Sequence, residues 1–295
     1  MTVPARPRRS VLYMPGSNAR AIEKARSLDA DGIILDLEDA VAPDAKAAAR
    51  AQVAAAVSAG GFGPREVVVR VNALDTPWFE DDLASAAAAG PDAVLIPKVS
   101  SPETLQVVGG KLAALGAPAT LKVWAMVETP LSVLRATEIA LAAQDPATRL
   151  AVLVLGTNDL AKETGAWIVP GRLPMLSWLS MCVLAARAGG IGILDGVWNA
   201  FQDVDGFTRE CDQGAELGFD GKTLIHPGQI GPCNAAFSPP EAEVAQARAL
   251  IAVFDRPENA GLGVVQIEGR MFERLHAEMA RRTVALAEAI AARAG

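Results

Sequence analysis

Two apolar stretches decide the fold: Leu121-Lys-Val-Trp-Ala-Met-Val-Glu128 and Leu150-Ala-Val-Leu-Val-Leu-Gly-Thr-Asn-Asp159. Each is a nearly continuous apolar run of strand length, which is typical of a parallel strand that is covered on both faces. Each run also ends at an acidic residue, Glu128 in the first and Asp159 in the second. We therefore expect two neighbouring parallel strands whose carboxyl ends place two carboxylates side by side.

Six further runs of the same kind occur along the chain, and they alternate with stretches that have helical features. The eight predicted strands are residues 10–16, 32–39, 66–72, 93–99, 121–128, 150–159, 191–198 and 219–226. Eight strands alternating with eight helices predict an α/β protein with a (β/α)8 architecture, the TIM barrel. The alternative is an open doubly wound sheet, but such sheets usually have fewer strands and a Gly-x-Gly-x-x-Gly motif after the first strand. That motif is absent here.

The sequence changes in character near residue 238, which suggests a catalytic barrel domain over residues 1–237 and a C-terminal helical extension over 238–295. After Ser238-Pro-Pro240 we expect a helix over 241–254, a short hairpin or turn over 264–271 and a long helix over 272–293. The barrel pattern does not require this extension. We interpret it as a cover for an active-site mouth, either that of its own subunit or that of a neighbour. The alternative is that it closes the bottom of the barrel.

The composition excludes several classes of function. A net charge of -7 over 295 residues argues against nucleic acid or an anionic membrane as the main partner. No apolar run reaches the ~18 residues that a membrane span needs, and the N-terminal residues lack the apolar region of a secretion signal. The three cysteines are far apart and form no Cys-x-x-Cys motif, which indicates reduced thiols and a cytoplasmic protein. With two histidines, a multi-histidine zinc site is not expected.

Glu128 and Asp159 are candidates for a metal site. Active sites of (β/α)8 barrels lie at the carboxyl ends of the strands, where both acids are expected. A hard divalent cation takes oxygen ligands and keeps several waters. The alternative is that the two acids cap the helices that follow, Glu128 before Pro130 and Asp159 before Leu160.

Arg70 lies in the run Val67-Val-Val-Arg-Val-Asn72, which is otherwise mainly apolar. A guanidinium there is unfavourable unless it pairs with a carboxylate, of the protein or of a ligand. Pairing with an acid of the stretch Asp36-Leu-Glu-Asp39 is the alternative to ligand binding. Together with two acids and a cation, the arginine suits a small acid with an adjacent carbonyl, because it would stabilise negative charge that develops there.

Other polar residues are expected at the same end of the barrel. Gly156, Thr157 and Asn158 open a helix with free backbone N–H groups, which suits a carboxylate, although an ordinary turn explains them equally. Lys98 would either form a Schiff base or pair with an acid, and we prefer the pairing because a metal site already supplies the electron sink. The candidate partners of Lys98 are Glu38, Asp39 and Glu128, and further supporting candidates are Asp195 and His226.

Seven motifs carry a resemblance to a known family: Arg9-Ser-Val-Leu-Tyr-Met-Pro-Gly16, Asp36-Leu-Glu-Asp-Ala-Val41, Arg70-Val-Asn72, Pro97-Lys98, Glu128-Thr-Pro130, Gly156-Thr-Asn-Asp-Leu160 and Asp220-Gly-Lys-Thr-Leu-Ile-His-Pro227. They resemble the HpcH/HpaI aldolase and citrate lyase beta-subunit family, and most closely its malyl-CoA and citramalyl-CoA lyases. The resemblance implies a Mg2+-dependent carbon–carbon lyase that cleaves short 3-hydroxyacyl-CoA thioesters (malyl-CoA, methylmalyl-CoA or citramalyl-CoA) to an acyl-CoA and a 2-oxo acid. The alternatives within the family are a malyl-CoA thioesterase, which releases malate and CoA, and a citrate lyase beta-like subunit.

The resemblance also implies residue roles and an assembly. It assigns Glu128 and Asp159 to the metal and Arg70 to substrate and enolate. From their places at the strand ends, Glu38, Asp39 and Lys98 are expected to be supporting groups. It implies a homotrimer or homohexamer in which the C-terminal segment of one subunit reaches the active site of the next. Basic residues near the mouth would hold coenzyme A, and the candidates are Arg9, Arg20 and Lys24.

The proton donor is where this sequence departs from the lyase relatives. They carry an aspartate in a Gly-x-Met-Ile-Asp-like motif, whereas this chain has Gly269-Arg-Met-Phe-Glu273. Glutamate is one methylene longer, and positional errors of ~1 Å can lower a rate about a hundredfold. This departure weakens the lyase prediction, and the sequence does not separate a lyase from a thioesterase. Glu273 is alternatively a solvated acid at the start of a helix.

Overall fold

The computed structural model describes residues 6–267 and 269–294. The chain forms two compact units, one of residues Arg8–Ala235 and one that contains the segment from Ala236 onward. The division therefore falls close to the boundary expected after residue 237.

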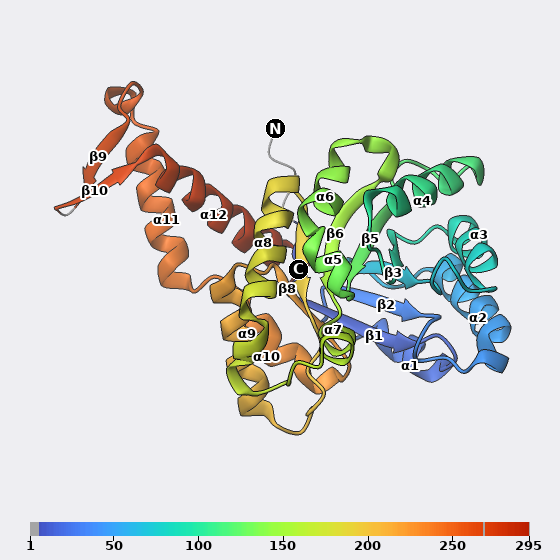
Figure 1. Cartoon of the computed structure of the whole chain (residues 1–295). Coiled ribbons are helices and arrows are strands. Elements are labelled where there is room, and N and C mark those ends of the chain that lie inside the picture. The colour runs from blue at the N-terminus through green and yellow to red at the C-terminus, as the bar shows by residue number, and fades with distance from the viewer. Residues whose placement is uncertain (1–5, 268, 295) are drawn as a thin grey trace. The chain divides into compact units, whose positions relative to one another are not determined.

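Residues Arg8–Ala235 form a closed barrel of eight parallel strands with helices around it (Figure 1). The strands follow one another around the barrel in sequence order, and β1 pairs with β8 to close it. The strands are β1 Ser10–Pro15, β2 Gly32–Asp36, β3 Glu66–Arg70, β4 Ala93–Ile96, β5 Lys122–Val127, β6 Leu150–Leu155, β7 Gly192–Asp195 and β8 Gly221–Leu224. The predicted (β/α)8 barrel is confirmed.

The strand sequences are apolar because almost every position is buried. In β3, all five residues from Glu66 to Arg70 are buried, including the two charged ones at its ends. A cluster of fully or nearly fully buried side chains from β1 to β7 forms one continuous core, as expected for a barrel whose interior is filled by side chains. Its larger members are Ile34, Leu95, Trp124, Met126 and Leu194.

The helices of the barrel unit follow the strands. They are α1 Ala19–Ala25, α2 Lys46–Ala59, α3 Phe79–Ala89, α4 Pro102–Ala114, α5 Pro130–Leu134, α6 Ala136–Leu141, α7 Thr157–Thr164, α8 Leu176–Gly189, α9 Val204–Leu217 and α10 Ile230–Ala236. The segment after β6 is more complex than the single helix we expected from Leu160. Gly165 ends α7 in a left-handed conformation, and the irregular 3-10 segment η4 (Pro170–Met175) then leads into α8.

The C-terminal unit has its own small core. It contains helix α11 (Glu241–Phe254), the antiparallel hairpin of β9 (Val264–Ile267) and β10 (Arg270–Glu273), and helix α12 (Arg274–Ala294). Apolar side chains of both helices and of β9 pack together, among them Leu250, Phe254 and Val265. That this unit covers an active-site mouth stays a prediction.

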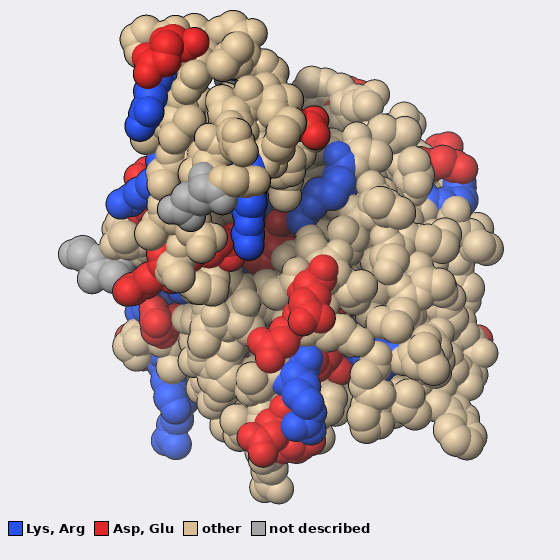
Figure 2. All heavy atoms as spheres, turned by 90° about the vertical axis from the view of Figure 1, so that its left-hand side faces the viewer, with Lys and Arg blue, Asp and Glu red and all other residues tan. Residues whose placement is uncertain are grey.

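The surface carries charges of both signs. On the face shown in Figure 2, Lys and Arg side chains are interspersed with Asp and Glu, and much of the surface is uncharged. Within residues 6–267 and 269–294, none of the helices combines the length and the apolar composition that crossing a bilayer requires.

Candidate active site

A cavity of about 380 Å3 lies among residues at the carboxyl ends of the barrel strands. These residues come from the strands β1, β2, β3, β5, β6 and β8 and from the segments after β2, β6, β7 and β8. The structure thus brings together most of the polar residues that the sequence placed at this end. The predicted site residues in the cavity wall are Asp39, Arg70, Gly156, Thr157, Asn158 and Asp159.

Arg70, the last residue of β3, is enclosed by acids. Its Nε and Nη2 donate to the two carboxylate oxygens of Asp36 at 2.7 and 2.6 Å. Its Nη1 pairs with Glu38 at 2.8 Å and with Asp39 at 3.2 Å, and the ring of Tyr13 lies 4.9 Å from the guanidinium carbon. Burial disfavours the charge of Arg70, but Asp36, Tyr13 and Glu38 together outweigh it and raise the pKa of Arg70 well above its ordinary value. The alternative considered for Arg70, an ion pair with an acid of the stretch 36–39, is therefore present. The arginine also lines the cavity.

The acids around Arg70 are not all neutralised by it. Burial raises the pKa of Glu38 to about 8; Arg70 opposes this, while Asp39, Glu128 and Asp36 add to it. The loop that carries these acids is held by Lys46, a buried residue at the start of α2. Its ammonium donates to the main-chain oxygens of Leu37 at 2.8 Å and Glu38 at 2.6 Å. The loop is therefore fixed, and with a pKa of about 8 the Glu38 carboxyl is largely protonated at neutral pH.

Glu128 follows β5 and is 2% exposed. Its Oε1 accepts the backbone N–H of Lys98 at 2.7 Å, and the Lys98 side chain is exposed. Lys98 has φ 53°, a left-handed conformation that is unfavourable for a residue with a Cβ and that aims its N–H at the acid. Gly156 lies against the other side of Glu128, because a Cβ there would overlap the Cβ of the glutamate. Both neighbours fix the orientation of this carboxylate through the backbone.

Glu128 and Asp159 lie close enough to repel each other. Burial raises the pKa of Glu128 to about 7, and the charge of Asp159 adds to the rise. A cation between the two carboxylates would relieve this repulsion. Mg2+ is usually held by one or two carboxylates and completed by substrate and water oxygens. In the described part of the chain, no group of three or more His, Cys, Asp and Glu side chains could hold a metal ion. The two carboxylates of Glu128 and Asp159 fit Mg2+, which needs no more than one or two.

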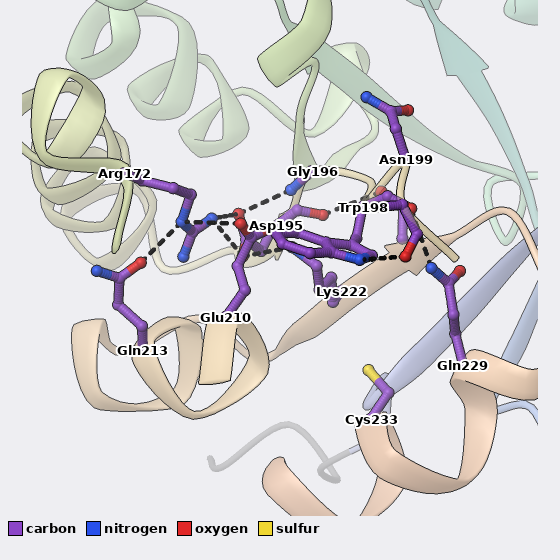
Figure 3. Close-up of polar contacts among 12 residues, drawn as sticks. Arg172, Asp195, Gly196, Trp198, Asn199, Glu210, Gln213, Lys222, Gln229 and Cys233 are labelled. Carbon is purple, nitrogen blue, oxygen red and sulfur yellow. Dashed lines mark hydrogen bonds and ion pairs between the residues drawn. The ribbon is translucent and has the colours of Figure 1, made fainter. Parts of the chain in front are cut away.

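A second polar centre lies between β7, β8 and α9, and Figure 3 shows its contacts. Asp195 and Lys222 are completely buried and form an ion pair at 2.9 Å. Arg172 donates its Nη1 to both oxygens of Asp195 at 2.7 Å, and Glu210 accepts from Lys222 at 2.7 Å. We call Arg172, Asp195, Glu210 and Lys222 the buried quartet. It contains two cations and two anions, and so it is formally neutral.

The buried quartet holds the loop after β7. Asp195 accepts the backbone N–H of Gly196 at 2.8 Å through its Oδ1, and the hydroxyl of Thr223 donates to the Asp195 main-chain oxygen at 3.0 Å. Further along, Gln229 donates to the main-chain oxygen of Trp198 at 3.0 Å (Figure 3). The same loop supplies Val197 and Asn199 to the cavity wall. Arg172 and Glu210 were not predicted from the sequence, and Lys222 was placed at the end of the eighth strand only as part of the Asp220–Pro227 motif, without a role.

The candidates for coenzyme A lie in different places. Arg9 precedes β1 at the amino-terminal end of the barrel, where its Nε and Nη2 donate to Asp31 at 2.9 Å each. This end is opposite to the cavity, so the structure does not bring Arg9 to the site, and we do not retain it as a ligand of coenzyme A. Arg20 and Lys24 are exposed on α1, which follows the carboxyl end of β1.

Two further candidates are exposed. His226 caps a short 3-10 turn by accepting the N–H of Gly228, and its ring stacks on Phe201. Glu273 is the last residue of β10 in the C-terminal unit, and its backbone N–H donates to Nδ1 of His276 at 2.9 Å. The predicted role of Glu273 in catalysis stays a prediction.

A closed parallel barrel with acids and a buried arginine at its carboxyl ends defines a (β/α)8 barrel of the kind that carries its active site there. The chain belongs to the HpcH/HpaI aldolase/citrate lyase family, which its residues 9–227 match. Residues 173–291 also match the family described as C-C bond lyase of the TIM-barrel fold. The resemblance inferred from the seven motifs is confirmed.

Individual relatives cover almost the whole chain. It is 50% identical over 288 residues to a (3S)-malyl-CoA thioesterase from Cereibacter sphaeroides, covering 98% of this chain and 97% of that one. CitE from Mycobacterium tuberculosis, solved in complex with magnesium, acetoacetate and coenzyme A, is 30% identical with a TM-score of 0.75, covering 96% of this chain and 98% of that one. The citrate lyase beta subunit from the same organism, complexed with oxaloacetate and magnesium, is 31% identical with a TM-score of 0.65, covering 79% and 98%.

Proposed function

We propose that the protein is a Mg2+-dependent enzyme that cleaves short 3-hydroxyacyl-CoA thioesters (malyl-CoA, methylmalyl-CoA or citramalyl-CoA) into an acyl-CoA and a 2-oxo acid. The charge of the site is the observation that carries this proposal. Asp36, Asp39 and Asp159 line the cavity, Glu38 and Glu128 lie near these acids, and Arg70 is ion-paired with Asp36, Glu38 and Asp39. An anionic substrate would be repelled from so acidic a site unless a divalent cation bound with it.

Glu128 and Asp159 would hold Mg2+, which when bound would supply electrostatic stabilisation to the carboxylate and neighbouring oxygens of the substrate. Arg70 would face the thioester and stabilise the negative charge of an enolate, because it lines the cavity and its hydrogen bonds to Asp36 and Asp39 do not use all five of its N–H groups. Gly156, Thr157 and Asn158, at the start of the eight-residue helix α7, would bind the far carboxylate through backbone N–H groups.

Three residues would act by support. Glu38 and Asp39 hold the guanidinium of Arg70 in place. Lys98 orients Glu128 through its backbone N–H, so we propose that its main-chain conformation matters more than its ammonium group. A 2-oxo acid product would then leave from a site whose charged groups are fixed before the reaction.

Hydrolysis of malyl-CoA to malate and CoA is the second candidate reaction. The 50% identity with a (3S)-malyl-CoA thioesterase favours it. We propose that Glu273 supplies the proton-transfer group from the C-terminal unit in either reaction. Its extra methylene, relative to the aspartate of the lyase relatives, would favour hydrolysis by displacing the acid from the carbon that must be protonated. A citrate lyase beta-like subunit, which needs an acyl-carrier partner, would show neither reaction alone.

We propose a homotrimer or homohexamer, in which a neighbouring subunit's extension completes the site. Exposed apolar side chains on α5 and α8 support an oligomer: Leu134 is 75% and Leu184 70% exposed. Arg20 and Lys24 remain the candidates for contact with coenzyme A. We place the protein in the cytoplasm, since Cys182, Cys211 and Cys233 are free thiols.

Product analysis separates these possibilities. Purified protein is incubated with malyl-CoA, with and without Mg2+, and the products are separated by liquid chromatography. Acetyl-CoA with glyoxylate identifies the lyase, malate with free CoA identifies the thioesterase, and no turnover contradicts both. Glu128→Gln and Asp159→Asn should abolish turnover, whereas Glu216→Gln, an exposed acid on α9, should retain it.

Glu273→Asp tests the acid of the C-terminal unit. If the reach of the carboxylate limits carbon–carbon cleavage, this variant should form more acetyl-CoA relative to free CoA than the wild type. An unchanged product ratio would remove Glu273 from the proposal.

A further inference from the structure

A second cavity, of about 210 Å3, adjoins the cavity that holds the site. The two cavities share part of their walls, namely Thr157, Asn158, Val197 and Asn199. These residues belong to the segments after β6 and after β7, so the wall is formed where the two segments meet. A change in this wall would alter the space beside the site without altering the barrel.

Two contacts close the wall. Asn158 and Asn199 exchange amide hydrogen bonds: Nδ2 of Asn199 donates to Oδ1 of Asn158 at 2.8 Å, and Nδ2 of Asn158 donates to Oδ1 of Asn199 at 3.2 Å. Beside them the two segments touch, since a Cβ on Gly196 would overlap the hydroxyl of Thr157. Both asparagines are exposed, so water competes with their hydrogen bonds, and the bonds restrict the wall without being needed for the fold.

The second cavity has an apolar lining over most of its wall: Ile168, Val169, Pro170, Met175 and Trp198. Its charged members, Arg172 and Glu210, form ion pairs within the buried quartet, although the buried Nη2 of Arg172 has no hydrogen-bond partner. A cavity of about 150 Å3 with an apolar lining is enough to hold benzene, and this one is larger. It therefore suits an uncharged hydrocarbon group of a few carbons.

We propose that the Asn158–Asn199 amide pair determines substrate specificity by separating the site from this second cavity, so that only short 2-oxo acids fit. When Asn199 is shortened, the alkyl chain of a longer 2-oxo acid enters the second cavity while its carboxylate and oxo group stay with Mg2+. This inference rests on the proposed function, because it assumes that a 2-oxo acid binds in the first cavity.

The test measures binding of 2-oxo acids in the presence of Mg2+ by calorimetry, so it does not depend on which reaction follows. The probes are glyoxylate, pyruvate, 2-oxobutyrate and 2-oxovalerate. The wild type should bind pyruvate more tightly than 2-oxovalerate. Asn199→Ala should raise the affinity for 2-oxovalerate relative to pyruvate by at least about tenfold, the discrimination expected of one methylene in an apolar pocket. Asn199→Gly is the second variant, in case the alanine methyl keeps the wall closed.

Two further variants show whether the gain comes from the second cavity. In the Asn199→Ala background, Val169→Phe fills that cavity and should return the affinity ratio to the wild-type value. Gln202→Ala changes an exposed residue of the same loop that lines neither cavity, and should leave the ratio unchanged.

The outcomes distinguish this inference from the proposed function. If the wild type binds pyruvate with Mg2+ but neither Asn199 variant changes the ratio, the specificity role is overturned and the proposed function stands. The same conclusion follows if Val169→Phe does not reverse the gain. If the wild type binds none of the four acids, both proposals fall.

Discussion

Glu128→Gln removes one negative charge from the site and keeps the shape of the side chain. The oxygen of the glutamine can still accept the N–H of Lys98, which lies 2.7 Å from Oε1 in the wild type. The variant therefore separates the charge of Glu128 from its packing. Without Mg2+ the negative charge of Glu128 destabilises the folded state, because the carboxylate is buried and is repelled by Asp159.

The size of the effect follows from the pKa. Burial and Asp159 raise the pKa of Glu128 from 4.5 to about 7, so between these values the folded protein binds a proton that the unfolded chain has lost. The free energy of unfolding must then fall as the pH rises. Between pH 6 and pH 8 the fall due to Glu128 is about 1 kcal/mol. Glu38, with a pKa of about 8, changes stability in the same direction in both proteins and largely cancels in the comparison.

Urea unfolding at pH 6 and pH 8, with EDTA present, measures this difference. Relative to the wild type, Glu128→Gln should gain about 1 kcal/mol of stability on going from pH 6 to pH 8. Addition of Mg2+ should stabilise the wild type increasingly with concentration, and should not stabilise the variant. Glu216→Gln serves as the matched control, because Glu216 is exposed on α9. A difference that stays constant with pH, or equal stabilisation of both proteins by Mg2+, would refute the reasoning.

Two other substitutions test the fixed parts of the site. Arg70→Ala leaves Asp36 and its neighbouring acids without their cation. We expect the free energy of unfolding in urea to fall by about 3–5 kcal/mol, together with loss of turnover. Arg70→Lys should recover more stability than activity, because it restores the charge and not the paired geometry. Asp195→Asn leaves Lys222 and Arg172 with one buried carboxylate fewer, and should also lower the unfolding free energy by about 3–5 kcal/mol. A loss below about 1 kcal/mol in either alanine or asparagine variant would show that the buried charges are not held as the structure describes.

The sequence predicted the barrel and the acidic half of the site because both leave local signals. Glu128 and Asp159 each end an apolar strand-like run, and Arg70 interrupts one. A charged group in such a place needs a partner, and this physical requirement is visible without a structure. The prediction did not show that Asp36 is the main partner of Arg70, because strand register and loop conformation decide which acid lies nearest.

The contacts of the buried quartet could not be predicted from the local sequence. Lys222 gives the same local signal as Arg70, but Arg172 lies in the irregular segment η4 with φ 51°, and only the packing of η4 against β7 and α9 brings it to Asp195. The prediction that Arg9 binds coenzyme A is wrong for a related reason. It adjoins a strand, but at the amino-terminal end, where it pairs with Asp31. A charged residue in or beside a buried strand requires a partner of opposite charge. Only the end of the strand at which it lies decides whether it can take part in the active site.

The two charged regions of the barrel differ in a way that bears on mechanism. The buried quartet balances its charges internally, so it can hold the loop after β7 whether or not a ligand is present. The region around Arg70, Glu128 and Asp159 has more acids than cations, and Glu38 and Glu128 are buried, so these two carboxyls keep their protons to a higher pH than usual when no further cation is bound. A divalent cation that relieves this excess also supplies the attraction that a carboxylate substrate lacks. Binding of metal and of substrate should therefore strengthen each other, because the metal would offset both the burial and the repulsion by Asp159 that raise the pKa of Glu128.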